Sequence, residues 1–138
     1  MTAPSDVAVV SPRIPSNSPD ASTAAAKALN ALGELEVHSG TGGAGVIGIV
    51  AGTVLITDSG AALLTLAAPA AGAPSAGGND GNRLTIVSTT AIAHTVTTPA
   101  NGINGADSIA TFSAVADRIE LIAMDGVWYA INNSTTLS

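Results

Sequence analysis

Residues 118–132 read RIELIAMDGVWYAIN. Two apolar runs rich in β-forming side chains are separated by only two residues, Asp125 and Gly126. Asp-Gly is a favoured pair for the type I′ turn, because both central positions of that turn need a positive φ. The stretch therefore predicts a tight β-hairpin.

The turn also fixes which residues of the hairpin face one another, because paired positions step outward from it together. The expected pairs are Met124 with Val127, Ala123 with Trp128, Ile122 with Tyr129, and Leu121 with Ala130. One face then carries Ile119, Leu121, Ala123, Trp128 and Ala130. The other carries Glu120, Ile122, Met124, Val127, Tyr129 and Ile131. This second face is too apolar to be simply solvated, so we expect one face to meet a second sheet and the other a neighbouring chain.

The chain from about residue 45 onward has a similar sequence pattern, in which short apolar runs are separated by Gly, Asn, Asp and Pro. This pattern is typical of an all-β domain. The expected strands are 46–50, 53–57, 61–66, 83–88, 94–98, 109–112, 118–124 and 127–132. A second hairpin turn is expected at Ser59 and Gly60, and the Ala, Pro and Gly-rich loop over 67–82 is expected to cross between sheets or to reach a partner. The predicted fold class is all-β, an antiparallel β-sandwich or jelly-roll-like barrel over residues 45–138.

The first 44 residues differ in composition from this domain. Four prolines among serines and aspartates in residues 1–20 can neither continue a helix nor join the interior of a sheet. We predict an extended N-terminal arm over residues 1–44. Within it, DASTAAAKALNAL (Asp20–Leu32) has an N-cap residue, strong helix formers and Gly33 as a stop, which allows a short helix over 21–32.

Composition and charge exclude several classes of protein. The chain has 138 residues, no cysteine, a net charge of -6 and only four Lys and Arg residues. Nucleic-acid binding is disfavoured, because phosphate neutralisation needs clustered cations. No apolar stretch is long enough for a membrane-spanning helix. Aromatic residues make up 2% of the chain, so few large side chains are available for the core. We therefore expect copies of the chain to stabilise one another by association.

The sequence offers no catalytic, cofactor or metal motif that withstands inspection. Residues 43–48 spell the G-x-G-x-x-G pattern, but a glycine-rich linker precedes it and a β-like run follows, whereas a dinucleotide site needs a strand before and a helix after. His38 and His94 have no neighbour at metal-ligand spacing. We expect no enzyme activity, no cofactor and no metal, with His94 as a hydrogen-bonded residue of an oligomer interface.

Three stretches together resemble a known family: GNDGNRLTIVSTTAIAHTVTTPANGING (78–105), ATF (110–112) and DRIELIAMDGVWYAI (117–131). The chain resembles, over about residues 45–131, a module of tailed-bacteriophage virion proteins, especially head decoration (cement) proteins and head-fibre proteins. The resemblance implies an all-β domain, usually a homotrimer, on the outer surface of the capsid. Such a domain binds where subunits of the major capsid protein meet.

The resemblance and the composition together predict a non-enzymatic capsid decoration protein that stabilises the head from the outside of the virion. Its partners are the major capsid protein and further copies of itself, with no nucleic acid and no membrane. The expected capsid contacts in the arm are Val7, Val9, Val10, Arg13 and Ile14. The expected oligomer-interface residues are Ile122, Met124, Tyr129, Ile131 and His94.

Two alternatives remain open from the sequence. A virion fibre or spike module that binds host surface glycan needs aromatic platforms. Only Trp128 and Tyr129 are available, and the hairpin register puts them on opposite faces. A small lyase or hydrolase on a β-fold would depend on a carboxylate pair whose geometry the sequence does not define.

Overall fold

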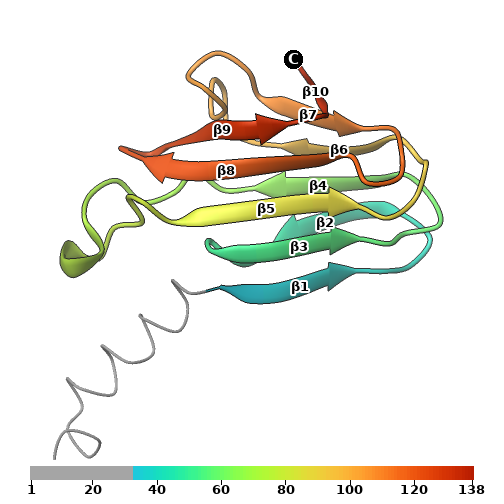
Figure 1. Ribbon diagram of the computed structural model, residues 1–138, viewed down its shortest axis with the longest axis horizontal. Helices are drawn as coiled ribbons and strands as arrows, with labels where there is room; N and C mark the ends of the chain where they lie inside the picture. The colour runs from blue at the N-terminus through green and yellow to red at the C-terminus, as the bar shows by residue number, and fades with distance from the viewer. Residues whose placement is uncertain (1–32) are drawn as a thin grey trace, which may run out of the picture.

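Residues 33–138 form two five-stranded β-sheets packed face to face (Figure 1). The structure is a computed structural model and describes residues 33–138. The β1 sheet has the strand order β1-β3-β5-β8-β9, and the β2 sheet has the order β10-β7-β6-β4-β2. The strands are β1 Glu34–His38, β2 Gly43–Ile47, β3 Gly52–Ile56, β4 Ala62–Leu66, β5 Arg83–Ser88, β6 His94–Thr97, β7 Ile109–Phe112, β8 Arg118–Met124, β9 Val127–Asn133 and β10 Thr136–Leu137. The predicted all-β class and the two-layer arrangement are confirmed.

Two expectations concern residues outside this range. The short helix over 21–32 and the arm residues Val7, Val9, Val10, Arg13 and Ile14 lie outside the described residues. Within 33–138, no helix has the length and apolar character needed to cross a membrane.

The first six strands alternate between the two sheets, so that the chain winds as a flattened coil. β1, β3 and β5 stack in parallel in one sheet, and β2, β4 and β6 stack in parallel in the other. The later strands β7, β8, β9 and β10 extend both sheets in the antiparallel sense. The expectation of an antiparallel sandwich is therefore wrong for half of the pairings, because each early strand pairs with the strand two places along the chain.

The turn predicted at Ser59 and Gly60 is not a hairpin. It carries the chain from β3 in one sheet to β4 in the other. A type I′ turn needs positive φ at both central residues, and neither Ser59 nor Gly60 has one. Gly60 is required for a different reason: a Cβ there would lie 2.1 Å from the carbonyl oxygen of Thr41, in the preceding crossover.

The β-domain begins earlier than predicted, because strand β1 and the start of β2 lie within the residues assigned to the arm. The sequence of β1 is ELEVH, and its register with β3 pairs Glu36 with the buried Val54 and Val37 with Leu55. The charged residues of β1 therefore point inward and its apolar residues point outward. This inversion of the usual pattern explains why β1 was missed.

The β8–β9 hairpin agrees with its predicted register. Met124 pairs with Val127 and Ile122 with Tyr129, and the turn residues Asp125 and Gly126 have φ values of 52° and 81°. The four predicted pairs are all present. A register shift between Glu120 and Leu121 then leaves Ile131 of β9 without a partner in the ladder, a β-bulge that the sequence did not predict.

The core lies between the two sheets and is built mainly from Ile, Leu and Val. Its members are Ile47, Val54, Ile56, Ala62, Leu64, Leu66, Leu84, Ile86, Val96, Ile103, Ala110, Phe112, Ile119, Leu121, Ala123 and Trp128. Trp128 is fully buried, and its indole N–H donates to the carbonyl oxygen of Ala67 at 3.0 Å. Ala67 opens the loop over 67–82, which crosses from the β2 sheet to the β1 sheet as expected. One aromatic side chain thus fixes the start of the longest loop against the core.

Candidate interaction surface

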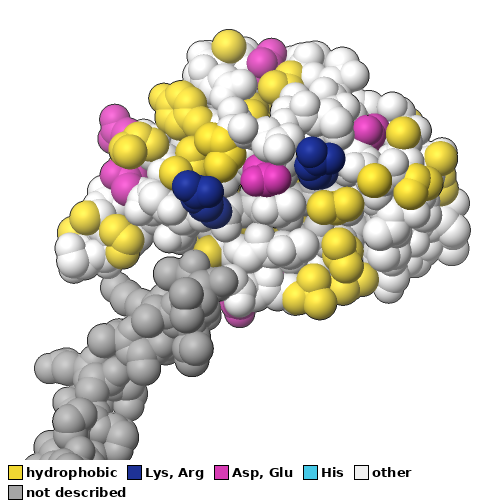
Figure 2. Space-filling model, viewed as in Figure 1, with side chains coloured by type: hydrophobic (Ala, Val, Ile, Leu, Met, Phe, Trp, Pro, Cys, Tyr) yellow, Lys and Arg dark blue, Asp and Glu magenta, His cyan; other side chains and the backbone are white. Residues whose placement is uncertain are grey.

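The outer face of the β1 sheet carries two apolar patches separated by a charged band (Figure 2). The hairpin patch consists of Ile122, Met124, Val127, Tyr129 and Ile131 on β8 and β9. The edge patch consists of Leu35, Val37, Leu55 and Val87 on β1, β3 and β5. Alternation along each strand turns these residues away from the core, which lies on the opposite side of the same strands.

The hairpin patch is exposed in the isolated chain. Met124 is 51% exposed, Ile131 is 48% exposed and Tyr129 is 40% exposed. Ile131 is also the extra residue of the bulge, which the ladder leaves unpaired. The structure therefore brings together four of the five predicted oligomer-interface residues (Ile122, Met124, Tyr129 and Ile131) on one accessible surface.

The edge patch follows from the parallel register and was not predicted. Val37, Leu55 and Val87 form one row across three adjacent strands. Leu35 is 65% exposed and Val37 is 49% exposed, although both belong to an edge strand, where exposed apolar side chains favour association. The alternation in ELEVH was the available signal, but it does not say which face of the strand is inward.

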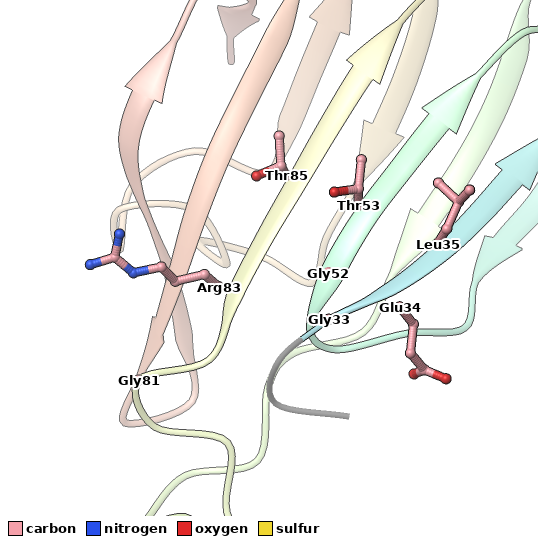
Figure 3. Close-up of a pocket in the computed structure, with 8 residues that line it drawn as sticks. All are labelled: Gly33, Glu34, Leu35, Gly52, Thr53, Gly81, Arg83 and Thr85. Atoms are coloured by element: carbon pink, nitrogen blue, oxygen red, sulfur yellow. The ribbon is translucent and has the colours of Figure 1, made fainter. Parts of the chain in front are cut away.

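The charged band contains Arg83, Arg118 and Glu120, which are the charged residues of β5 and β8. At one end of this face, next to Arg83, an open groove of about 720 Å³ is lined by side chains of β1, β3 and β5 (Figure 3). Thr85, Thr53 and Leu35 stand in a row across the groove, while Arg83 extends to the side away from Leu35. The groove thus combines the polar side chains of Glu34, Thr53, Arg83 and Thr85 with the apolar side chain of Leu35.

His94 is placed differently from the expectation. Its side chain is fully buried, so it is not available to a neighbouring chain. Its Nδ1 atom accepts the backbone N–H of Ala62 at 3.0 Å, and its Nε2 atom lies 2.7 Å from the hydroxyl of Thr90. Burial lowers the pKa of His94, and the nearby carboxylate of Asp58 opposes this effect only in part. The imidazole has a structural role inside the chain.

The hydrogen bonds of His94 define its tautomer. Nδ1 is an acceptor for Ala62, so the proton of the neutral ring is on Nε2 and is donated to Thr90. The hydroxyl of Thr90 in turn donates to the carbonyl oxygen of Asp58 at 3.2 Å. A ring with both nitrogens engaged in this way has no free lone pair to act as a general base.

The second histidine also forms an intramolecular contact. His38 Nε2 lies 2.5 Å from a carboxylate oxygen of Glu36, and the other oxygen of Glu36 accepts the N–H of Gly48 at 2.9 Å. Both side chains lie on the core side of the sheet, because their strand partners Val54 and Ile56 are buried. Among residues 33–138, no three His, Cys, Asp or Glu side chains are grouped as metal ligands would be.

The remaining motifs are part of the scaffold. The glycine pattern over 43–48 forms β2 and its exit, and β3 follows. Trp128 is buried, so of the two aromatic side chains considered for stacking on a glycan only Tyr129 is on the surface.

Comparison with known proteins adds no family. No protein-family model matches the chain, and no curated protein matches it. Surface geometry and the sequence resemblance therefore carry the functional proposal.

Proposed function

We propose that this protein is a non-enzymatic decoration protein of a tailed-phage head. It binds the outer surface of the capsid as a homotrimer, between subunits of the major capsid protein, and strengthens the shell. The proposal rests on the sequence resemblance together with one structural observation, the exposed apolar surface on the β1 sheet.

The hairpin patch is the observation that carries this proposal. A chain with a net charge of -6 leaves three large apolar side chains of one hairpin 40% to 51% exposed. Exposed apolar surface that is contiguous and bordered by charged residues is typical of a protein–protein contact. Arg83, Arg118 and Glu120 provide that border here.

Attachment by three linked copies explains how modest contacts hold a protein on a shell. Once one chain of a trimer is bound, the others bind at a high effective concentration, so the affinities multiply. The expected arm contacts at Val7, Val9, Val10, Arg13 and Ile14 add to this avidity. Binding energy, without any chemical step, then stabilises the capsid by mass action.

The glycan-binding alternative has less support. A glycan site needs aromatic platforms next to polar side chains, and Tyr129 is the single aromatic ring on the described surface. Its nearest neighbour across the hairpin is Ile122, which offers no hydrogen bond to a sugar.

The proposal is tested by the heat stability of capsids with and without the protein. Expanded capsids, assembled from the major capsid protein encoded with this chain, are heated after incubation with the full-length chain. We expect the capsid melting temperature to rise with added chain and then to level off. A full-length variant with Val7→Asp, Val9→Asp and Val10→Asp is expected to protect less. Unchanged melting at saturating wild-type chain contradicts the proposal.

A further inference from the structure

The outer face of the β2 sheet contains no charged side chain. Its strands β2, β4, β6, β7 and β10 read GAGVI, ALLTL, HTVT, IATF and TL, without Asp, Glu, Lys or Arg. The one titratable residue among them, His94, is buried on the inner side. Within residues 33–138, all five charged residues that lie in strands belong to the β1 sheet. Among the described strands, charge is thus confined to the β1 sheet.

The uncharged face is an ordered array of threonine and aliphatic residues. We define it as Ala44, Val46, Leu63, Thr65, Thr95, Thr97, Ile109, Thr111 and Thr136. The registers place them in two rows, of which one is Ala44, Leu63, Thr95, Thr111 and Thr136. The other row is Val46, Thr65, Thr97 and Ile109. None of the nine is buried, and Val46 is 70% exposed.

This face combines a projection with a hollow. Leu63 is 53% exposed on β4. In the other row of this face, an open hollow of about 320 Å³ is lined by Val46, Thr65, Leu66, Ala67, Thr97, Thr98 and Pro99. A surface that holds both a projecting apolar side chain and an apolar hollow can be complementary to a copy of itself.

The charge pattern favours a second copy of this chain as the partner of the uncharged face. In a cyclic trimer, neighbouring copies meet through different parts of the same surface, and only residues close to the axis meet their own copies. A charged residue close to the axis therefore faces the same charge, and every copy of this chain is acidic. The charged band on the β1 sheet, with Arg118 and Glu120, is unsuited to that position. A threonine hydroxyl both donates and accepts a hydrogen bond, so identical threonines can satisfy one another across an axis. The hydroxyls of Thr95, Thr97 and Thr111 have no hydrogen-bond partner within residues 33–138.

We propose that the uncharged face of the β2 sheet is the contact between copies of this chain around the rotation axis of its homotrimer. The inference deepens the proposed function and rests on its homotrimer. It differs from the sequence-based expectation, which put the hairpin patch at the axis. With the axis at the β2 sheet, the hairpin patch points away from it and is free for the major capsid protein.

The test is the solution mass of full-length variants, measured by light scattering at one concentration. Leu63→Glu adds a charge to the uncharged face, and Met124→Glu adds the same charge to the hairpin patch. The two positions are matched, with exposures of 53% and 51%. Val115→Glu, on a loop and 63% exposed, controls for the added charge alone. Circular dichroism checks that each variant is folded.

We expect the wild type, Met124→Glu and Val115→Glu to have three times the chain mass, and Leu63→Glu to fall to about one third of that value. A trimeric Leu63→Glu, or a monomeric Met124→Glu, overturns the inference, and a monomeric wild type removes the homotrimer as well. Capsid binding of the wild type is measured in parallel. A trimer that dissociates with Leu63→Glu but does not bind capsids leaves the inference standing and overturns the proposed function.

Discussion

The Nδ1 atom of His94 accepts the backbone N–H of Ala62 at 3.0 Å, and this bond joins β6 to β4 inside the sandwich. The imidazole is fully buried, so no water replaces the bond if it is lost. Protonation of the ring converts Nδ1 from an acceptor to a donor. Its N–H would then point at the N–H of Ala62, and the hydrogen bond would be lost. The stability of the fold therefore depends on a neutral His94.

The free energy of unfolding is expected to fall in mild acid because of His94. Burial holds its pKa in the folded protein below 6.5, so the unfolded chain takes up the proton first as the pH falls. The contribution of neutral His94 to the free energy of unfolding is complete above pH 6.5. It is lost progressively as the pH falls through 6.5 toward the pKa of His94 in the folded protein. Urea unfolding between pH 8 and pH 5 measures this loss.

The variant His94→Asn isolates the effect, because its side-chain oxygen can accept the N–H of Ala62 without titrating. Its absolute stability is lower, but its stability should change less with pH than that of the wild type. Equal pH dependence of the two proteins excludes His94 as the cause. Asp117 titrates in a separate window below pH 3.8, because the N–H groups of Ser113 and Ala114 lower its pKa.

Gly60→Ala is expected to destabilise the fold at the stacked crossovers. Its Cβ would lie 2.1 Å from the carbonyl oxygen of Thr41, which is backbone and not free to move aside. Overpacking of this kind costs about 1–3 kcal/mol. Ser59→Ala is the neighbouring control: it removes only an exposed hydrogen bond to Gly40, so the loss is about 1 kcal/mol or less. Similar melting temperatures for the two variants contradict this account.

Trp128→Phe is expected to lower the free energy of unfolding by about 1–3 kcal/mol, because it removes the indole donor to Ala67 and leaves a small void. Tyr129→Phe, at the next and exposed position, is expected to change stability by less than about 0.5 kcal/mol. Thermal unfolding followed by circular dichroism compares them. Faster proteolysis within 67–82 in Trp128→Phe alone would show that the indole anchors that loop.

The hairpin was predictable because its determinants are local. Asp125 and Gly126 need positive φ for reasons of backbone sterics, and two residues between two strands leave a single register. The exposed hairpin patch followed from the same register. The bulge at Ile131 was not predictable, because it depends on how β9 meets the end of β8 and the segment beyond it.

The parallel stacking was not predictable from the same reasoning. Each early strand pairs with a strand from the next turn of the coil, and nothing in the local sequence identifies that partner. In β1, Glu36 points inward because Gly48 and His38 satisfy its carboxylate. The burial of His94 was not predictable, because its hydrogen-bond partners lie outside its own strand. Ala62 belongs to β4, and Thr90 belongs to the β5–β6 connection.

Whether this chain decorates a capsid is tested by the amount of full-length chain that sediments with expanded capsids as the chain concentration rises. We expect saturable binding that reaches a fixed number of trimers per capsid and that weakens in Met124→Glu, whose solution mass stays trimeric. A chain that remains in the supernatant at every concentration, while the capsids sediment intact, contradicts the proposal.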